Sequence, residues 1–158
     1  MRPVSRAHEV RVRVQVWGRQ DSAVRASSGG GRGGLAYVAV TVGQCLTYVY
    51  DVDGLGAHLQ AWRQAAQMNR AVRLGEFGPP LTAQQGFAHG QDLAVVCHVN
   101  GEQPVGGQAS AGSGGRPVMT VTVGAVSTTV HTTTALLSYL DGWTRAGTAQ
   151  VILARPGE

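Results

Sequence analysis

The chain has 158 residues and a net charge of +4; 43% of its residues are hydrophobic and 14% are charged. This length allows one compact domain or two small halves that share a core. The sequence lacks the run of roughly 18 apolar residues that spans a membrane, and its start lacks the apolar core of a signal peptide. We therefore expect a cytoplasmic protein without a membrane partner.

The charge is unevenly distributed along the chain. Residues 1–80 contain ten Arg and five acidic residues, which gives +5, whereas residues 81–158 contain three Arg and four acidic residues, which gives −1. This asymmetry favours a polyanionic partner for the first half. All thirteen basic residues are Arg, and we interpret this as the mark of a high-GC bacterial genome.

The first half of the chain begins with a basic arm at residues 1–9. Apolar and polar residues then alternate strictly over residues 10–17, which is typical of a half-buried strand. Residues 18–34 are rich in Gly, Ser and Arg, which predicts a long loop. Two further strands are predicted at residues 35–42 and 45–52, with a tight turn at Gly43 and Gln44 between them.

A helix follows the third strand. Asp53 lies where the helix N-cap is expected, because its carboxylate can accept an unpaired backbone N–H of the first turn. Leu55, Leu59, Trp62 and Ala66 then recur at helical spacing and form one apolar stripe. The helix is expected to stop near Gly75, which begins a linker rich in Gly and Pro at residues 75–91.

The second half repeats the first. Residues 40–65 and 121–146 align without a gap and share ten identities in 26 positions, including Trp62 and Trp143. The same order is predicted again, with strands at residues 93–99, 118–123 and 125–133 and a loop at residues 100–116. Thr134 is the expected cap of a helix that carries Leu136, Leu140 and Trp143 and ends at Gly147. A last strand is predicted at residues 148–154.

The sequence therefore predicts an α+β fold built from a tandem duplicated strand-strand-strand-helix module, with antiparallel sheets and one helix in each half. The first repeat covers residues 10–74 and the second covers residues 92–158. A thin three-stranded unit with one helix has little core of its own. We therefore expect the two repeats to pack as a pseudo-dimer in one compact unit, with each Trp buried against its own sheet.

The outer sheet face of the first repeat is the candidate site. The equivalent face of the second repeat carries Thr, Ser and His instead of basic and aromatic residues. Guanidinium groups can neutralise phosphates, and flat rings can stack on bases. The candidate residues for binding nucleic acid are Arg11, Arg13, Trp17, Arg19, Arg25, Arg32, Tyr48 and Tyr50.

Catalytic and metal sites are not indicated. His98 and His131 are expected to share the outer face of the second repeat, but no third ligand is found at a suitable strand position. Cys45 and Cys97 form no Cys-x-x-Cys motif, so we expect neither a zinc site nor a disulfide framework. No nucleophile elbow and no facing carboxylate pair is present, so we expect no enzyme activity and no cofactor.

We interpret the chain as a non-enzymatic accessory or regulatory protein that binds nucleic acid, with single-stranded DNA or RNA favoured. The order of its elements is similar to that of the Whirly-type single-strand binders. Two alternatives stay open. In the first, the aromatic face is a protein interface, for example in a homodimer. In the second, the duplicated units enclose a small-molecule pocket of the vicinal-oxygen-chelate kind, which usually needs His and Glu metal ligands.

Overall fold

The computed structural model describes residues 10–29, 34–76 and 93–153. The expected arm and most of the expected linker lie outside these ranges. The elements of the first half are β1 (Val12–Val16), β2 (Ser22–Ser27), β3 (Tyr37–Val42), β4 (Cys45–Val49) and α1 (Val52–Val72). Those of the second half are β5 (Val95–Val99), β6 (Val105–Ala111), β7 (Pro117–Val123), β8 (Val126–Val130) and α2 (Thr133–Gly147). Two 3-10 turns, η2 (Ser113–Gly115) and η3 (Gln150–Ile152), complete the described elements.

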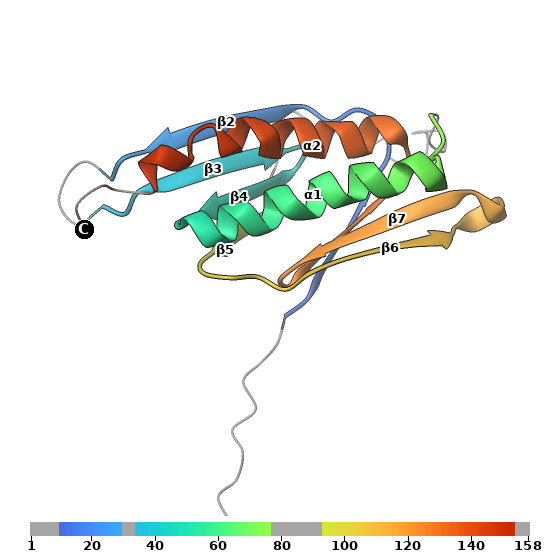
Figure 1. Ribbon diagram of the computed structural model, residues 1–158, viewed down its shortest axis with the longest axis horizontal. Helices are drawn as coiled ribbons and strands as arrows, with labels where there is room; N and C mark the ends of the chain where they lie inside the picture. The colour runs from blue at the N-terminus through green and yellow to red at the C-terminus, as the bar shows by residue number, and fades with distance from the viewer. Residues whose placement is uncertain (1–9, 30–33, 77–92, 154–158) are drawn as a thin grey trace, which may run out of the picture.

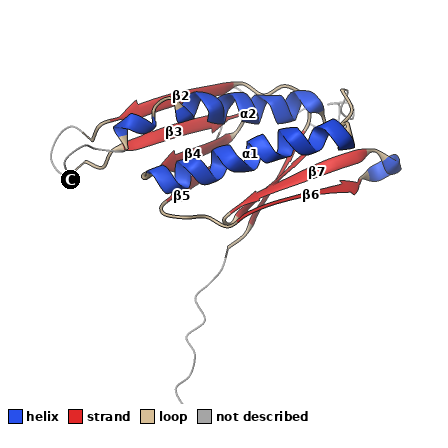
Figure 2. Ribbon diagram, in the orientation of Figure 1, coloured by secondary structure: helices blue, strands red, loops and turns tan. Residues whose placement is uncertain are grey.

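The α+β class and the duplicated order of strands followed by a helix are confirmed (Figure 2). Each half has one strand more than expected, because β2 and β6 form where loops were predicted. Both are edge strands whose small and polar residues have weak strand propensity of their own. Their conformation is decided by antiparallel pairing with β3 and β7.

The strand expected at residues 148–154 is not formed in the described part of that range, residues 148–153. Residues 150–152 make a 3-10 turn instead. The backbone amides of Ala149 and Ile152 donate to the carbonyls of Ala146 and Ala149, so the helical hydrogen-bonding pattern continues past the end of α2. Local turns therefore satisfy the backbone groups that a ladder would have used.

The two halves exchange their first strands. β1 pairs in parallel with β8, and β5 pairs in parallel with β4. The two sheets consequently have the strand orders β1-β8-β7-β6 and β2-β3-β4-β5. Each sheet is mainly antiparallel, as expected, but the prediction that each half keeps its own first strand is wrong.

The helices are exchanged as well. α1 packs mainly on β6 and β7, α2 packs mainly on β2 and β3, and the two helices contact each other (Figure 1). Trp62 and Trp143 are buried, at 2% and 3% exposure, as predicted. Their helices nevertheless lie chiefly over strands of the opposite half, which corrects the expectation that each Trp packs on its own sheet.

The crossing strands are tied to the helix starts in the same way in both halves. In the first half, the Asp51 carboxylate caps α1 by accepting from Gly54 N at 2.7 Å, and it also accepts from the amide of Gly101, just after β5. The cap therefore lies two residues before the predicted one, Asp53. One side chain thus secures both the helix and the strand that arrives from the other half.

The second helix repeats this arrangement with a hydroxyl group. Thr132 Oγ1 accepts from Ala135 N at 3.1 Å and from Gly18 N, just after β1, at 2.9 Å. The cap again lies two residues before the predicted one, Thr134. The matching contacts show that the two halves are related as an internal pseudo-dimer.

A single core lies between the helices and the two sheets. Its buried members come from both halves, and the largest side chains with less than 2% exposure include Leu55, Met119 and Leu136. Among the described helices, none is both long and apolar enough to cross a bilayer.

We expect Trp143→Ala to lower the free energy of unfolding by about 3–5 kcal/mol, because large-to-small changes in a packed core leave a cavity. Trp62→Ala should cost a similar amount, since the two residues occupy equivalent buried positions. Urea denaturation followed by circular dichroism checks both variants. If the urea midpoint of either variant were unchanged, the apolar stripe of the helix that carries the substituted Trp would not be part of the core.

We also expect that neither half folds alone. A fragment with residues 1–76 would lack β5, the parallel partner of β4. Its own β1 would have no partner, because β8 is also missing. Circular dichroism of this fragment and of residues 93–158 should show little cooperative unfolding, whereas an equimolar mixture should regain it. Cooperative folding of either fragment by itself would contradict the strand exchange.

Candidate functional site

The strand exchange divides the predicted site between two sheets. Arg13 and Trp17 belong to the sheet of β1 and β8, whereas Tyr48 and Tyr50 belong to the sheet of β4 and β5. The expectation that these residues share one face is therefore wrong. It assumed that β1 stays beside the strands of its own half.

The remaining predicted residues are also distributed. Arg11 immediately precedes β1, and Arg19 lies in the connection between β1 and β2. Arg25 was expected in a loop but lies on β2, where its side chain is exposed. Arg32 lies outside the described residues.

One row of residues crosses the outer face of the β2-β3-β4-β5 sheet. Arg25 is paired with Ala39, Ala39 with Tyr48, and Tyr48 with His98. The row thus begins with a cation, passes a buried small residue and ends with two aromatic rings. His98 reaches it only because β5 arrives from the second half, so sequence reasoning placed it elsewhere.

The rings of this face form a connected tyrosine cluster, which consists of Tyr37, Tyr48, Tyr50 and His98. The ring of His98 is stacked on those of Tyr48 and Tyr50, with centroid distances of 5.0 and 5.8 Å. Tyr37 meets Tyr48 edge-on at 5.3 Å, and the Tyr50 hydroxyl and His98 Nδ1 are 2.5 Å apart. These contacts hold the rings in fixed orientations on a half-exposed surface.

The matching row on the other sheet is uncharged and contains no aromatic ring. It consists of Gln108, Thr120, Thr129 and Gln15. The hydroxyls of Thr120 and Thr129 bond to each other at 2.8 Å. The aromatic part of the predicted contrast is therefore present in the two hairpins. Its basic part is wrong, because Arg11 and Arg13 lie at β1, beside the Thr-rich hairpin.

His98 and His131 do not share a face. His131 lies beside β1, where its ring is stacked on Trp17 at 4.3 Å and its Nε2 lies 2.6 Å from Gln15 Oε1. The indole Nε1 of Trp17 is buried and has no hydrogen-bond partner among the described residues. No group of three or more His, Cys, Asp or Glu residues that could hold a metal occurs in the described part of the chain.

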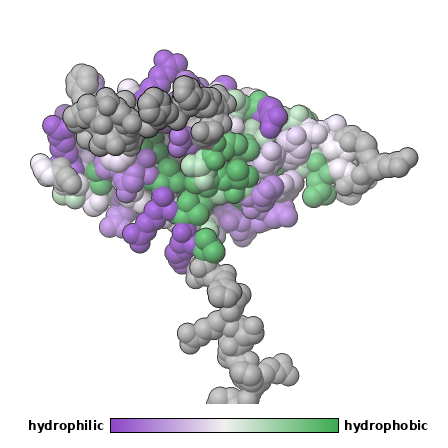
Figure 3. Space-filling model, turned by 180° about the vertical axis from the view of Figure 1, so that it is seen from behind, coloured by the Kyte–Doolittle hydropathy of each residue, from purple (hydrophilic) through white to green (hydrophobic). Residues whose placement is uncertain are grey.

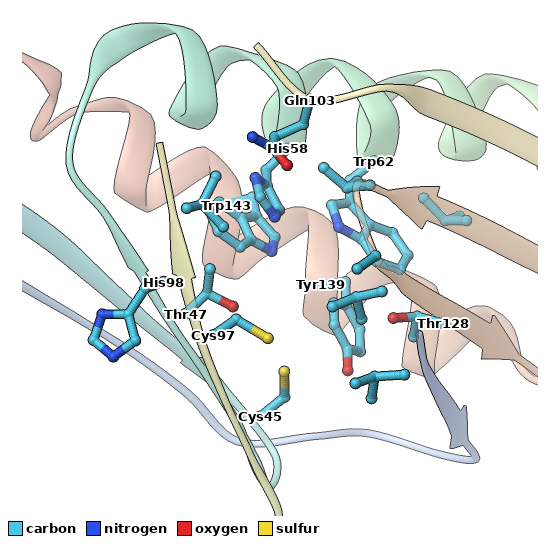
Figure 4. Close-up of a pocket in the computed structure, with 16 residues that line it drawn as sticks. Cys45, Thr47, His58, Trp62, Cys97, His98, Gln103, Thr128, Tyr139 and Trp143 are labelled. Carbon is cyan, nitrogen blue, oxygen red and sulfur yellow. The ribbon is translucent and has the colours of Figure 1, made fainter. Parts of the chain in front are cut away.

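A second feature, a cavity of about 230 Å³, lies inside the molecule between the helices and the sheets (Figure 4). Two stacked aromatic pairs line it at equivalent positions of the halves. His58 is stacked on Trp143 at 4.1 Å, and Tyr139 is stacked on Trp62 at 4.3 Å. A pocket between the duplicated units was expected only under the vicinal-oxygen-chelate alternative. None of the predicted site residues that the structure describes lines this cavity, because its lining comes from both halves and depends on the exchange.

His58 is neutral at physiological pH. It is 8% exposed, and burial lowers its pKa from 6.5 to about 4. Its Nδ1 lies 2.9 Å from the carbonyl oxygen of Gly54. Because a carbonyl only accepts, Nδ1 carries the proton, and Nε2 is the acceptor nitrogen of the ring.

Two thiols also line the cavity. Burial and a hydrogen bond donated to Cys97 raise the pKa of Cys45, the hydrogen bond having the larger effect. The same hydrogen bond lowers the pKa of Cys97 from 9.0 to about 7, in spite of partial burial. Both cysteines are free.

Comparison of the chain with protein-family models, with curated proteins and with solved structures finds no match. The assignment of a function therefore depends on the geometry of the outer face and of the cavity.

Buried neutral His58 predicts a pH-dependent stability. Between about pH 6.5 and pH 4 the unfolded chain binds more protons at this site than the folded one, so stability should fall as the pH falls, by about 3 kcal/mol over the full window. His58→Tyr, which introduces the residue found at the equivalent position 139, should remove this contribution. Urea midpoints of both proteins at several pH values check this, and a variant that kept the full wild-type dependence would contradict it.

Proposed function

We propose that the protein binds single-stranded nucleic acid on the outer face of the β2-β3-β4-β5 sheet. The observation that supports this most directly is the row from Arg25 to His98, which places a cation and a stacked pair of rings on one open face. Bases would stack on the tyrosine cluster, and Arg25 would contact the phosphate backbone.

The accessibility of this face supports the proposal. Both described helices pack on the opposite side of the sheets, as Figure 1 shows. His98 and Arg25 are exposed, and the three Tyr residues of the cluster are half-buried. Rings that are already held by their neighbours lose little conformational freedom when a base stacks on them.

Charge supports a nucleic acid over a neutral ligand. Arg25 has no ion-pair partner among the described residues, so its charge is available to a phosphate group. The whole chain carries +4. Single strands are favoured over duplexes because stacking on a flat sheet requires bases whose faces are open.

The interface alternative has its own support. The side of the molecule turned away from the helices shows apolar surface at its centre, bordered by hydrophilic residues (Figure 3). Val96, on β5 beside His98, is 52% exposed. A homodimer through this face would bury the tyrosine cluster, so the experiment must measure molecular mass as well as binding. We do not propose a vicinal-oxygen-chelate site, since the described residues include no metal-ligand group of the required size.

The test is a salt titration with a labelled single-stranded oligonucleotide and its duplex. Tyr48→Thr should weaken binding by about 5- to 150-fold, the equivalent of 1–3 kcal/mol for one stacked base, with an unchanged salt slope. Arg25→Gln should instead reduce the slope of log K against log salt by about 0.7, the value of one phosphate contact on a single strand.

The matched controls come from the other sheet, where Thr129 and Gln108 occupy the positions of Tyr48 and Arg25. Thr129→Ala and Gln108→Ala should leave binding and slope unchanged. Absence of wild-type binding at low salt would refute the proposal. If Tyr48→Thr changed the mass in solution instead, the interface alternative would replace it.

A further inference from the structure

The cavity contains a dithiol whose sulfur atoms face each other. Cys45 lies on β4 and Cys97 on β5, two adjacent parallel strands. Figure 4 shows both side chains pointing into the cavity, with their sulfur atoms turned toward one another. Interaction with Cys97 raises the pKa of Cys45, and interaction with Cys45 lowers the pKa of Cys97, which agrees with two thiols that lie close together. This site is separate from the outer face and does not depend on nucleic-acid binding.

The strand register disfavours a disulfide. Cys97 is paired with Thr47, and Cys45 lies two residues before Thr47 on β4. From a strand spacing of about 4.8 Å and a rise of about 3.3 Å per residue, the two Cα atoms are roughly 8 Å apart. Disulfides need Cα atoms within about 4.4–6.8 Å of each other, so a bond would require the strands to shift. The pair is therefore suited to remain two thiol ligands.

We propose that Cys45 and Cys97 bind one thiophilic monovalent cation, of the Cu⁺ class, between their sulfur atoms. Thiolates are soft ligands that prefer such ions. The number of available ligands favours a monovalent ion over Zn²⁺. Structural Zn²⁺ is held by four ligands, whereas d10 monovalent ions accept two in a near-linear arrangement. No group of three or more His, Cys, Asp or Glu residues is found in the described ranges, so two sulfurs are the complete set of such ligands.

The surroundings of the pair fit this class of ion. Trp143 and Tyr139 line the same cavity and shield a bound monovalent ion from water and oxidants. Access is available because the Cys97 side chain is only partly buried and the cavity volume of about 230 Å³ exceeds the size of an ion. On binding, any proton that either sulfur still holds passes to solvent.

The second half of the chain supplies matched variants. Cys45 is equivalent to Val126, and Cys97 is equivalent to Val14, because the strand pairs β4 with β5 and β8 with β1 have the same register. Cys45→Val and Cys97→Val therefore introduce a residue that the same backbone environment already accommodates. Equal urea midpoints of the variants and the wild type would verify that the fold is retained.

The experiment uses the reduced full-length chain, with Ag⁺ as a redox-inert probe and Cu⁺ in competition with a coloured chelator. We expect one ion per chain and a sulfur-to-metal absorption band in the ultraviolet. Each Val variant should bind at least about 100-fold more weakly, since loss of even an outer partner of a metal ligand costs about 10- to 100-fold. Zn²⁺ should not compete.

Three results would overturn the proposal. The first is retention of the ion by either Val variant, which would place the site elsewhere. The second is equally tight binding of Zn²⁺, which would require ligands that the dithiol does not provide. The third is rapid loss of both free thiols in the metal-free protein under a mild disulfide oxidant, which would identify a redox pair. Oligonucleotide binding by the Cys45→Val variant should match that of the wild type, so failure here would leave the outer-face proposal unaffected.

Discussion

The parallel pairing of β1 with β8 and of β5 with β4 is the constraint on which the rest of the structure depends. Among the described strands, β1 and β5 each have a single partner strand, and that strand belongs to the other half of the chain. Without this pairing, the backbone N–H and C=O groups of β1 and β5 would have no ladder partner. The pairing also requires the chain to cross at Gly18 and Gly101, where each amide donates to the cap of the opposite helix. Strand, cap and helix are thereby fixed together, so each half depends on the other.

Much of this fold could be predicted from the sequence, because the signals are local. The repeat, the two helices and the buried pair Trp62 and Trp143 follow from periodicity within short windows. The exchange could not be predicted. Alternation over residues 12–16 shows that this strand is half-buried, but it contains no information on which strand it pairs with. β2 and β6 were missed for the related reason that only their neighbours β3 and β7 make them strands.

The same limitation affected the candidate site. The alternation in β4 correctly placed Tyr48 and Tyr50 on an outer face, because alternate residues of a strand face opposite sides. The alternation could not predict which residues lie next to the two tyrosines, because these neighbours depend on the exchange of first strands between the halves. Arg13, expected beside the two tyrosines, lies on the other sheet, and His98 from the second half takes the position next to Tyr48. The row that carries the proposed function is therefore composed of both halves.

Because the chain contains two copies of the same unit, residues at equivalent positions can be compared to find which of them packing requires. At equivalent positions the two halves share nearly the same backbone environment, so a residue in one half shows what the fold accepts in the other. Thr128, equivalent to Thr47, is unchanged, which is expected of a position set by packing. Cys45 and Cys97 are equivalent to Val126 and Val14. Tyr48 and Arg25 are equivalent to Thr129 and Gln108. Because the same backbone arrangement holds a different residue at each equivalent position, the arrangement itself does not require the thiols, the ring or the guanidinium, and these are the residues on which the two proposals depend.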